Sequence, residues 1–233
     1  MDVDHLIQQL TESARPVTRL LAPWRRTSLW LTASLLYVGI VVAAYLLADG
    51  GVPATIEPRL VVELAAILAT AATAAIAAFS SIVPGRDWRL LLLPLIPLGL
   101  WLATLGHSCL QDWRVLGMAG LQVRADWDCA VPALIASALP AGAMLVMLRR
   151  GVPLVPAVSL ALGALATGAV ANLGLRIFHA SDLSVQILVW HAGGAVVVSL
   201  IASLAGPRVL AWRIWVGRAC SAKPNTAGSC DGR

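Results

Sequence analysis

The residues of this chain that could carry out chemistry lie in one polar stretch between two long apolar segments. They offer thiol, imidazole and carboxylate groups, and they are His107, Cys109, Asp112, Asp126, Asp128 and Cys129. Two cysteines about twenty residues apart, outside a reducing cytosol, are most simply a disulfide. Such a bridge stabilises a fold by roughly 3 kcal/mol in the chain-entropy model. In the alternative interpretation, the pair cycles between dithiol and disulfide as a redox switch.

Metal capture is a third interpretation of the same stretch. Thiolate, imidazole and carboxylate ligands together suit zinc or softer metals. The spacing of these six side chains matches no standard zinc pattern, so the metal signal is weak. The chain has no HExxH, Walker or GxSxG motif and no paired intramembrane carboxylates. We therefore expect neither an enzyme nor a resident cofactor.

The elements that position these residues are membrane helices. Of the 233 residues, 59% are hydrophobic and 12% are charged, which is about half the charge of a soluble domain. Apolar runs near the length of a bilayer crossing recur along the chain. The composition thus predicts an all-α, polytopic six-helix transmembrane bundle with short loops. The expected spans are Ser28–Ala48, Leu60–Val83, Leu90–Gly106, Ala130–Leu148, Leu154–Leu175 and Val185–Ala205.

Three regions follow from this pattern. Residues 1–27 form a cytosolic N-terminal segment, residues 28–205 the transmembrane domain, and residues 206–233 a basic cytosolic tail that looks largely disordered. Thirteen of the 17 Lys and Arg residues fall in the two terminal regions and the second and fourth connections. This bias places both termini in the cytosol and the Cys109–Cys129 stretch outside. Cys220 and Cys230 lie in the tail, where we expect reduced thiols without an assigned role.

The N-terminal segment predicts a short amphipathic helix that Pro16 ends. Val3, Leu6, Ile7 and Leu10 share one face at i, i+3, i+4 and i+7. This helix either lies on anionic lipid or docks its apolar face into a groove of a cytosolic protein.

Few ionisable side chains fall within the predicted spans. Glu63 and Arg176 are expected at the outer interface, where snorkelling or mutual pairing satisfies them. His191 is the best candidate for a buried ionisable residue, and a structural hydrogen-bonding role is favoured over proton transport. Small side chains recur every fourth position and predict close helix packing. They are Ala65, Ala69, Thr73, Ala77 and Ser81 in the second span and Ala195, Ser199 and Ser203 in the sixth.

Four segments together resemble one known family. They are DHLIQQL with RPVTRLLAPWRR, VPGRDWR, GHSCLQDW with DWDC, and LVWH. In order and spacing, from about Asp2 to Trp212, they are similar to the NrsF family of bacterial membrane anti-sigma factors. The resemblance implies a six-helix protein that holds an extracytoplasmic-function sigma factor inactive at the cytoplasmic membrane until an outside signal releases it. It also implicates Cys109 and Cys129 in sensing that signal.

The expected function is therefore a multi-pass anti-sigma factor of the bacterial inner membrane with cytosolic N- and C-termini. Its partners would be an extracytoplasmic-function sigma factor and the lipid bilayer, without direct nucleic-acid binding. The face of Val3, Leu6, Ile7 and Leu10 would bind the sigma factor, with the basic turns at Arg86 and Arg149–Arg150 beside it. The alternative is a small transporter, or a structural membrane protein whose outer loop is stapled by a disulfide.

Overall fold

A computed structural model describes residues 3–12, 21–49, 58–121, 123, 130–151, 153–178 and 184–210. Within these residues the chain is helical and contains no strand. Six helical stretches in this part are long and apolar enough to cross a membrane. The all-α, six-helix prediction is therefore confirmed. The elements are α1 (Val3–Glu12), α2 (Pro23–Asp49), α3 (Pro58–Ser80), η1 (Trp88–Leu92), α4 (Leu95–Leu116), η2 (Gly117–Leu121), α5 (Ala130–Arg149), α6 (Pro156–Phe178), α7 (Ser184–Ile187), η3 (Leu188–Gly193) and α8 (Gly194–Val209).

Prolines mark the true starts of three helices. Pro23, Pro58 and Pro156 open α2, α3 and α6, where a missing N–H costs nothing because the first turn has no acceptor for it. Hydropathy alone had placed the start of α2 at Ser28, because the arginines that follow Pro23 are polar. The last helix likewise continues to Val209, beyond the expected end at Ala205.

The largest correction concerns the third span. It was expected to end at Gly106, but α4 continues to Leu116, so His107, Cys109 and Asp112 lie on a helix rather than in a loop. Polar side chains made this stretch look like a loop, although none of them breaks a helix. The first residue that does is Gly117, whose φ of 60° lies in the left-handed region that glycine adopts freely.

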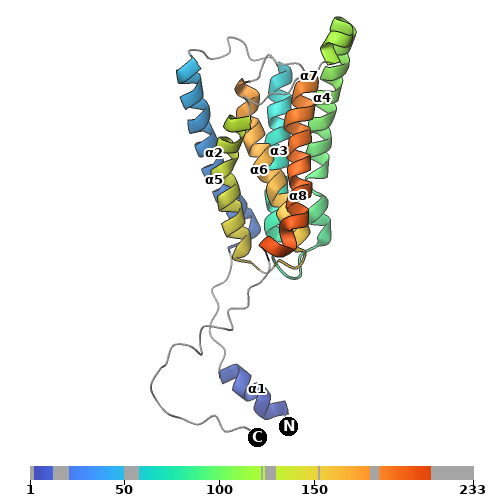
Figure 1. Cartoon of the computed structure of the whole chain (residues 1–233). Coiled ribbons are helices and arrows are strands. Elements are labelled where there is room, and N and C mark those ends of the chain that lie inside the picture. The colour runs from blue at the N-terminus through green and yellow to red at the C-terminus, as the bar shows by residue number, and fades with distance from the viewer. Residues whose placement is uncertain are drawn as a thin grey trace.

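Helix α6 forms the centre of the bundle. It packs against α2, α3, α5 and α8, while α3 also packs against α2 and α4. Helix α1 lies apart from the bundle, beyond the end where α2 begins (Figure 1). We call this end of the bundle the α1 end and the other the opposite end.

Small side chains line the buried side of α3, as expected, but the predicted stripe is buried only toward its end, where Ala77 is buried and Ser81 bonds to Ser159. Ala65 and Ala69 of the predicted stripe are exposed. Because α3 carries alanine on almost every side, spacing alone did not select the packing face. Hydroxyls of Ser81 and Ser159 meet at 2.7 Å where the two helices converge. The buried alanines of α3 are Ala66, Ala71, Ala74, Ala75, Ala77 and Ala78.

Helix α2 is attached to α5 by hydrogen bonds from aromatic side chains. The indole of Trp30 donates to the Pro140 carbonyl at 3.0 Å, and the hydroxyl of Tyr37 donates to the Ile135 carbonyl at 2.7 Å. Pro140 lacks an N–H, so it interrupts the hydrogen-bond ladder inside α5. The carbonyl that loses its helical donor is that of Ala136, and the two aromatic donors bind carbonyls on either side of it along α5.

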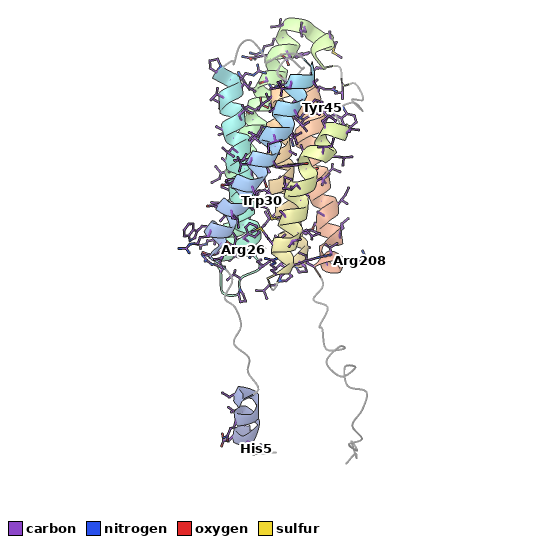
Figure 2. All side chains as sticks on the ribbon, turned by 90° about the vertical axis from the view of Figure 1, so that its left-hand side faces the viewer. His5, Arg26, Trp30, Tyr45 and Arg208 are labelled. Carbon is purple, nitrogen blue, oxygen red and sulfur yellow. The ribbon has the colours of Figure 1, made fainter. Side chains whose placement is uncertain are left out.

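Arg26 closes the same side of the bundle at the α1 end (Figure 2). Its guanidinium donates to the carbonyl of Met147 in α5 and lies 4.7 Å from the centre of the Phe79 ring in α3. The side chain is 4% exposed. One buried cation thus connects α2, α3 and α5 through a carbonyl and an aromatic face.

The sixth span is not a regular α-helix. Helices α7 and α8 are joined by a π-helical turn, η3, which contains His191. The side-chain amide of Asn172 in α6 donates to the His191 carbonyl at 3.3 Å and to the Gly168 carbonyl at 2.9 Å. A π turn shifts the carbonyl positions, and the α6 amide supplies a donor to one of them. The absence of a side chain at Gly168 lets α6 and α8 lie close together here, because a side-chain carbon at this position would come within 3.2 Å of Ala195.

Candidate functional site

A polar junction joins three helices at the opposite end of the bundle. The carboxylate of Asp112, on α4, accepts a hydrogen bond of 3.0 Å from the backbone N–H of Ser184. Ser184 begins α7, so the carboxylate satisfies a helix-start N–H group and favours the positive end of the helix dipole. Arg59, on α3, donates to the Ser184 hydroxyl at 2.9 Å and to the Gln111 side chain at 3.3 Å. We call these four residues the α3–α4–α7 junction.

Cys109 lies beside this junction. It precedes Asp112 by three positions on α4, so the two side chains share one face. The thiol is partly buried and is the only free cysteine among the described residues. A chemical change at this sulfur would act directly next to the contact between α4 and the start of α7.

The metal hypothesis involves six residues, of which the structure describes three. His107 is exposed. It precedes Cys109 by two positions, which places the two side chains on different faces of α4. Within the described part of the chain, no three His, Cys, Asp or Glu side chains form a group able to hold a metal ion. Asp126, Asp128 and Cys129 lie outside the described residues, and so does any disulfide to Cys109. Both hypotheses therefore stay predictions.

A buried ion pair lies one helical turn along α3 from Arg59. The Nε of Arg176, on α6, donates to the Glu63 carboxylate at 2.9 Å. The two side chains are 6% and 3% exposed, respectively. Of the two alternatives that the sequence allowed, snorkelling and mutual pairing, the structure has pairing. The pair connects α3 to α6 below the junction.

His191 is buried in η3 at the contact between α6 and the last helix. Its carbonyl accepts from Asn172, as described above. This bond uses a main-chain carbonyl and not the imidazole, so the choice between a structural His191 and a proton carrier stays a prediction.

Helix α1 presents exposed apolar side chains. Val3 is 67% and Ile7 55% exposed. Leu6 and Leu10 belong to the same helix, but their side chains lie outside the described residues. His5 lies on this helix apart from the bundle (Figure 2). A short helix that lies apart from the bundle and exposes an apolar face is typical of a segment that docks elsewhere.

Basic side chains gather at the α1 end of the bundle. They are exposed and are supplied by separate elements, namely Arg25, Arg86, Arg89, Arg149, Arg150 and Arg208. Sequence analysis missed the roles of Arg26, Arg59 and Ser184. The sequence offered one indication that Arg59 matters, namely its position one helical turn before Glu63. Its hydrogen-bond partners could not be predicted, because they come from α4 and α7, far along the chain.

A family model described as NrsF, negative regulator of sigma F, matches residues 10–212. The chain belongs to the NrsF family. The match covers the whole helical bundle and both Cys109 and Cys129, but it begins at Leu10 and so leaves out most of α1. No curated protein and no solved structure matched the chain. Membership in NrsF makes the protein a negative regulator of a sigma factor, which is a regulatory function with a sigma factor as partner.

Proposed function

We propose that this NrsF protein is an anti-sigma factor that holds an extracytoplasmic-function sigma factor at the cytoplasmic side of the bacterial inner membrane. A thiol or metal signal outside the cytosol releases it. Family membership supports the sigma partner, and the six apolar helices support a multi-pass membrane protein. The distribution of Lys and Arg supports cytosolic termini.

The observation that carries the docking proposal is the exposed apolar face of α1. Val3 and Ile7 are more than half exposed on a helix that lies apart from the bundle. A helix of this length is marginal in water and is stabilised by burying one face against a partner. The exposed arginines at the α1 end, Arg86, Arg149 and Arg150, border the same compartment and would meet acidic parts of the bound protein.

The structure suggests how an outside signal could reach that surface. A reaction at Cys109 would disturb the neighbouring hydrogen bond from Ser184 to Asp112. Elements α7, η3 and α8 follow one another without interruption from Ser184 to Val209. At the α1 end, Arg149 of α5 donates to the Val209 carbonyl at 3.2 Å. A displacement of α7 would therefore be transmitted along one helical rod to a basic turn near the docking surface.

The docking surface is tested by co-purification of the sigma factor with the full chain from membranes. Replacing Ile7 with Asp places a charge in the contact and removes burial worth about 2 kcal/mol, so affinity should fall about thirtyfold. His5→Asp adds the same charge to another face of α1 and should retain the sigma factor. Equal retention by both variants would mean that α1 is not the docking element.

The signal is tested on the same complex with a thiol oxidant or a soft metal ion. Wild type should release the sigma factor on treatment, whereas Cys109→Ser and Cys129→Ser should hold it. Retention by wild type under every condition would keep the anti-sigma function but assign the cysteines a purely structural bridge. If neither wild type nor any of the variants retained the sigma factor, this result would contradict the anti-sigma proposal itself.

A further inference from the structure

An elongated groove runs along the side of the bundle between α5 and α8, with α6 as its floor. Its volume is about 580 Å³, and its lining is mostly apolar. Helix α6 packs against both α5 and α8, but those two helices do not form a packed interface with each other. Figure 1 shows α6 behind and between them, so the groove opens to the side, where lipid surrounds a membrane protein.

The dimensions of the groove favour a slender occupant. Its lining on α6 extends from Leu160 to Leu175, a rise of about 22 Å at 1.5 Å per residue. A volume of about 580 Å³ spread over that length makes the groove long and narrow. A hydrocarbon chain fits a groove of this shape.

The groove ends in positive charge at the α1 end. Val209 lines it there, and the Nε of Arg149 donates to the Val209 carbonyl at 3.2 Å. Arg208 precedes Val209 and lies at the same end of the bundle (Figure 2). Both arginines are exposed, and neither forms an ion pair with a carboxylate among the described residues. Two guanidinium groups thus border the end of an apolar groove.

The other end of the groove offers no such charge. Asn172 and His191 line it, and the amide of Asn172 is already hydrogen-bonded to carbonyls of the bundle. A chain that starts at Leu160 and spans one leaflet, about 15 Å of the hydrocarbon core, ends near Val170. Between Leu160 and Val170 the one polar side chain in the lining on α6 is Thr167, whose hydroxyl donates to the Gly163 carbonyl at 2.9 Å. Asn172 and His191 lie beyond the length of one leaflet.

We propose that this groove binds one anionic phospholipid, with an acyl chain along α6 and the phosphate at Arg149 and Arg208. Basic sites between transmembrane helices on the cytoplasmic side are suited to anionic headgroups, and guanidinium groups bind phosphate oxygens in a bidentate manner. The Lys and Arg distribution assigns this end to the leaflet in which anionic lipids are enriched. The site shares Arg149 with the proposed docking surface, but lipid binding is measured on the protein alone, so its test does not depend on the sigma proposal.

The headgroup is tested by native mass spectrometry of the full chain in mild detergent. The protein is titrated with phosphatidylglycerol and with phosphatidylcholine of the same acyl chains. One phosphatidylglycerol should bind about tenfold more tightly than phosphatidylcholine, and the Arg149→Gln/Arg208→Gln variant should lose this difference. Arg86→Gln removes a charge in another turn and should keep it. Equal binding of the two lipids by wild type overturns the headgroup assignment.

The acyl-chain position is tested by filling the groove. Ala202 lines it on α8, and Ala202→Phe should reduce binding of both lipids about tenfold. Leu204 is 78% exposed and lies outside the lining, so Leu204→Phe should bind both lipids normally. Unchanged binding by Ala202→Phe overturns the proposal, and a dimer mass that this variant abolishes would assign the groove to a second copy. Should Ala202→Phe fail to fold, Ala164→Leu fills the same groove from α6.

Discussion

The Glu63–Arg176 pair allows a quantitative test of how the bundle is held together. The Arg176 Nε and the Glu63 carboxylate oxygen are 2.9 Å apart, and both side chains are almost fully buried. At an effective dielectric constant of 20, two unit charges at this distance attract by about 6 kcal/mol. Much of that attraction offsets the desolvation of the two groups, so the intact pair contributes far less than its Coulomb energy.

Removing one partner has a larger effect than removing both. Glu63→Gln or Arg176→Gln leaves a buried charge without its counterion, and each should destabilise the fold by about 3–5 kcal/mol. For a chain of this size that corresponds to a fall of about 6–20 °C in the unfolding midpoint. The double variant leaves no buried charge at this site and should be more stable than either single variant.

The measurement is thermal unfolding in detergent, followed by intrinsic fluorescence of the nine tryptophans. Arg114→Gln, at an exposed position on α4, is the matched control and should change the midpoint by less than about 2 °C. Single variants that match this control would refute the reasoning. So would a double variant whose loss equals the sum of the single losses, because additive losses mean that the two residues do not interact.

The same assay tests three other contacts. Trp30→Phe removes an indole hydrogen bond to α5 and should cost about 1 kcal/mol; an unchanged midpoint would assign the anchoring of α2 to packing alone. Gly174→Ala places a carbon 2.6 Å from the Val38 side chain and should cost about 1–3 kcal/mol, whereas a stabilised variant would show that α2 yields easily. Asp112→Ala removes the carboxylate bonded to the Ser184 N–H and should cost about 1 kcal/mol; in the co-purification assay it should also weaken sigma retention, and normal retention would separate the junction from signalling.

Local features of the sequence were enough to identify the fold. Apolar runs of bilayer length predicted six membrane helices, and the spacing of apolar residues in the N-terminal segment predicted α1. These features depend on each residue's own hydrophobicity and on contacts within one or two helical turns. The same features failed at the end of α4, because polarity was mistaken for a loop where only Gly117 stops the helix.

The sequence motifs by themselves resemble the NrsF family, and the family model confirms it over residues 10–212. The sites are a different matter. All three candidate roles of Cys109 involve Cys129, which lies outside the described residues, so the structural disulfide, the redox switch and the metal site stay predictions. The docking face of α1 is likewise a prediction, supported by the exposure of Val3 and Ile7.

The sequence by itself therefore determined the class of protein, the number of spans and the family, since each rests on composition or on short-range pattern. Only the tertiary structure decided which faces meet. When a helix is apolar on nearly every side, its sequence does not indicate which side faces a neighbouring helix. In α3, Ala71 and Ala74 are buried, whereas Ala65 and Ala69 are exposed although they have the same chemistry. The pairing of Glu63 with Arg176 joins residues 113 positions apart. Such contacts follow from how whole helices pack in three dimensions, which no local pattern encodes.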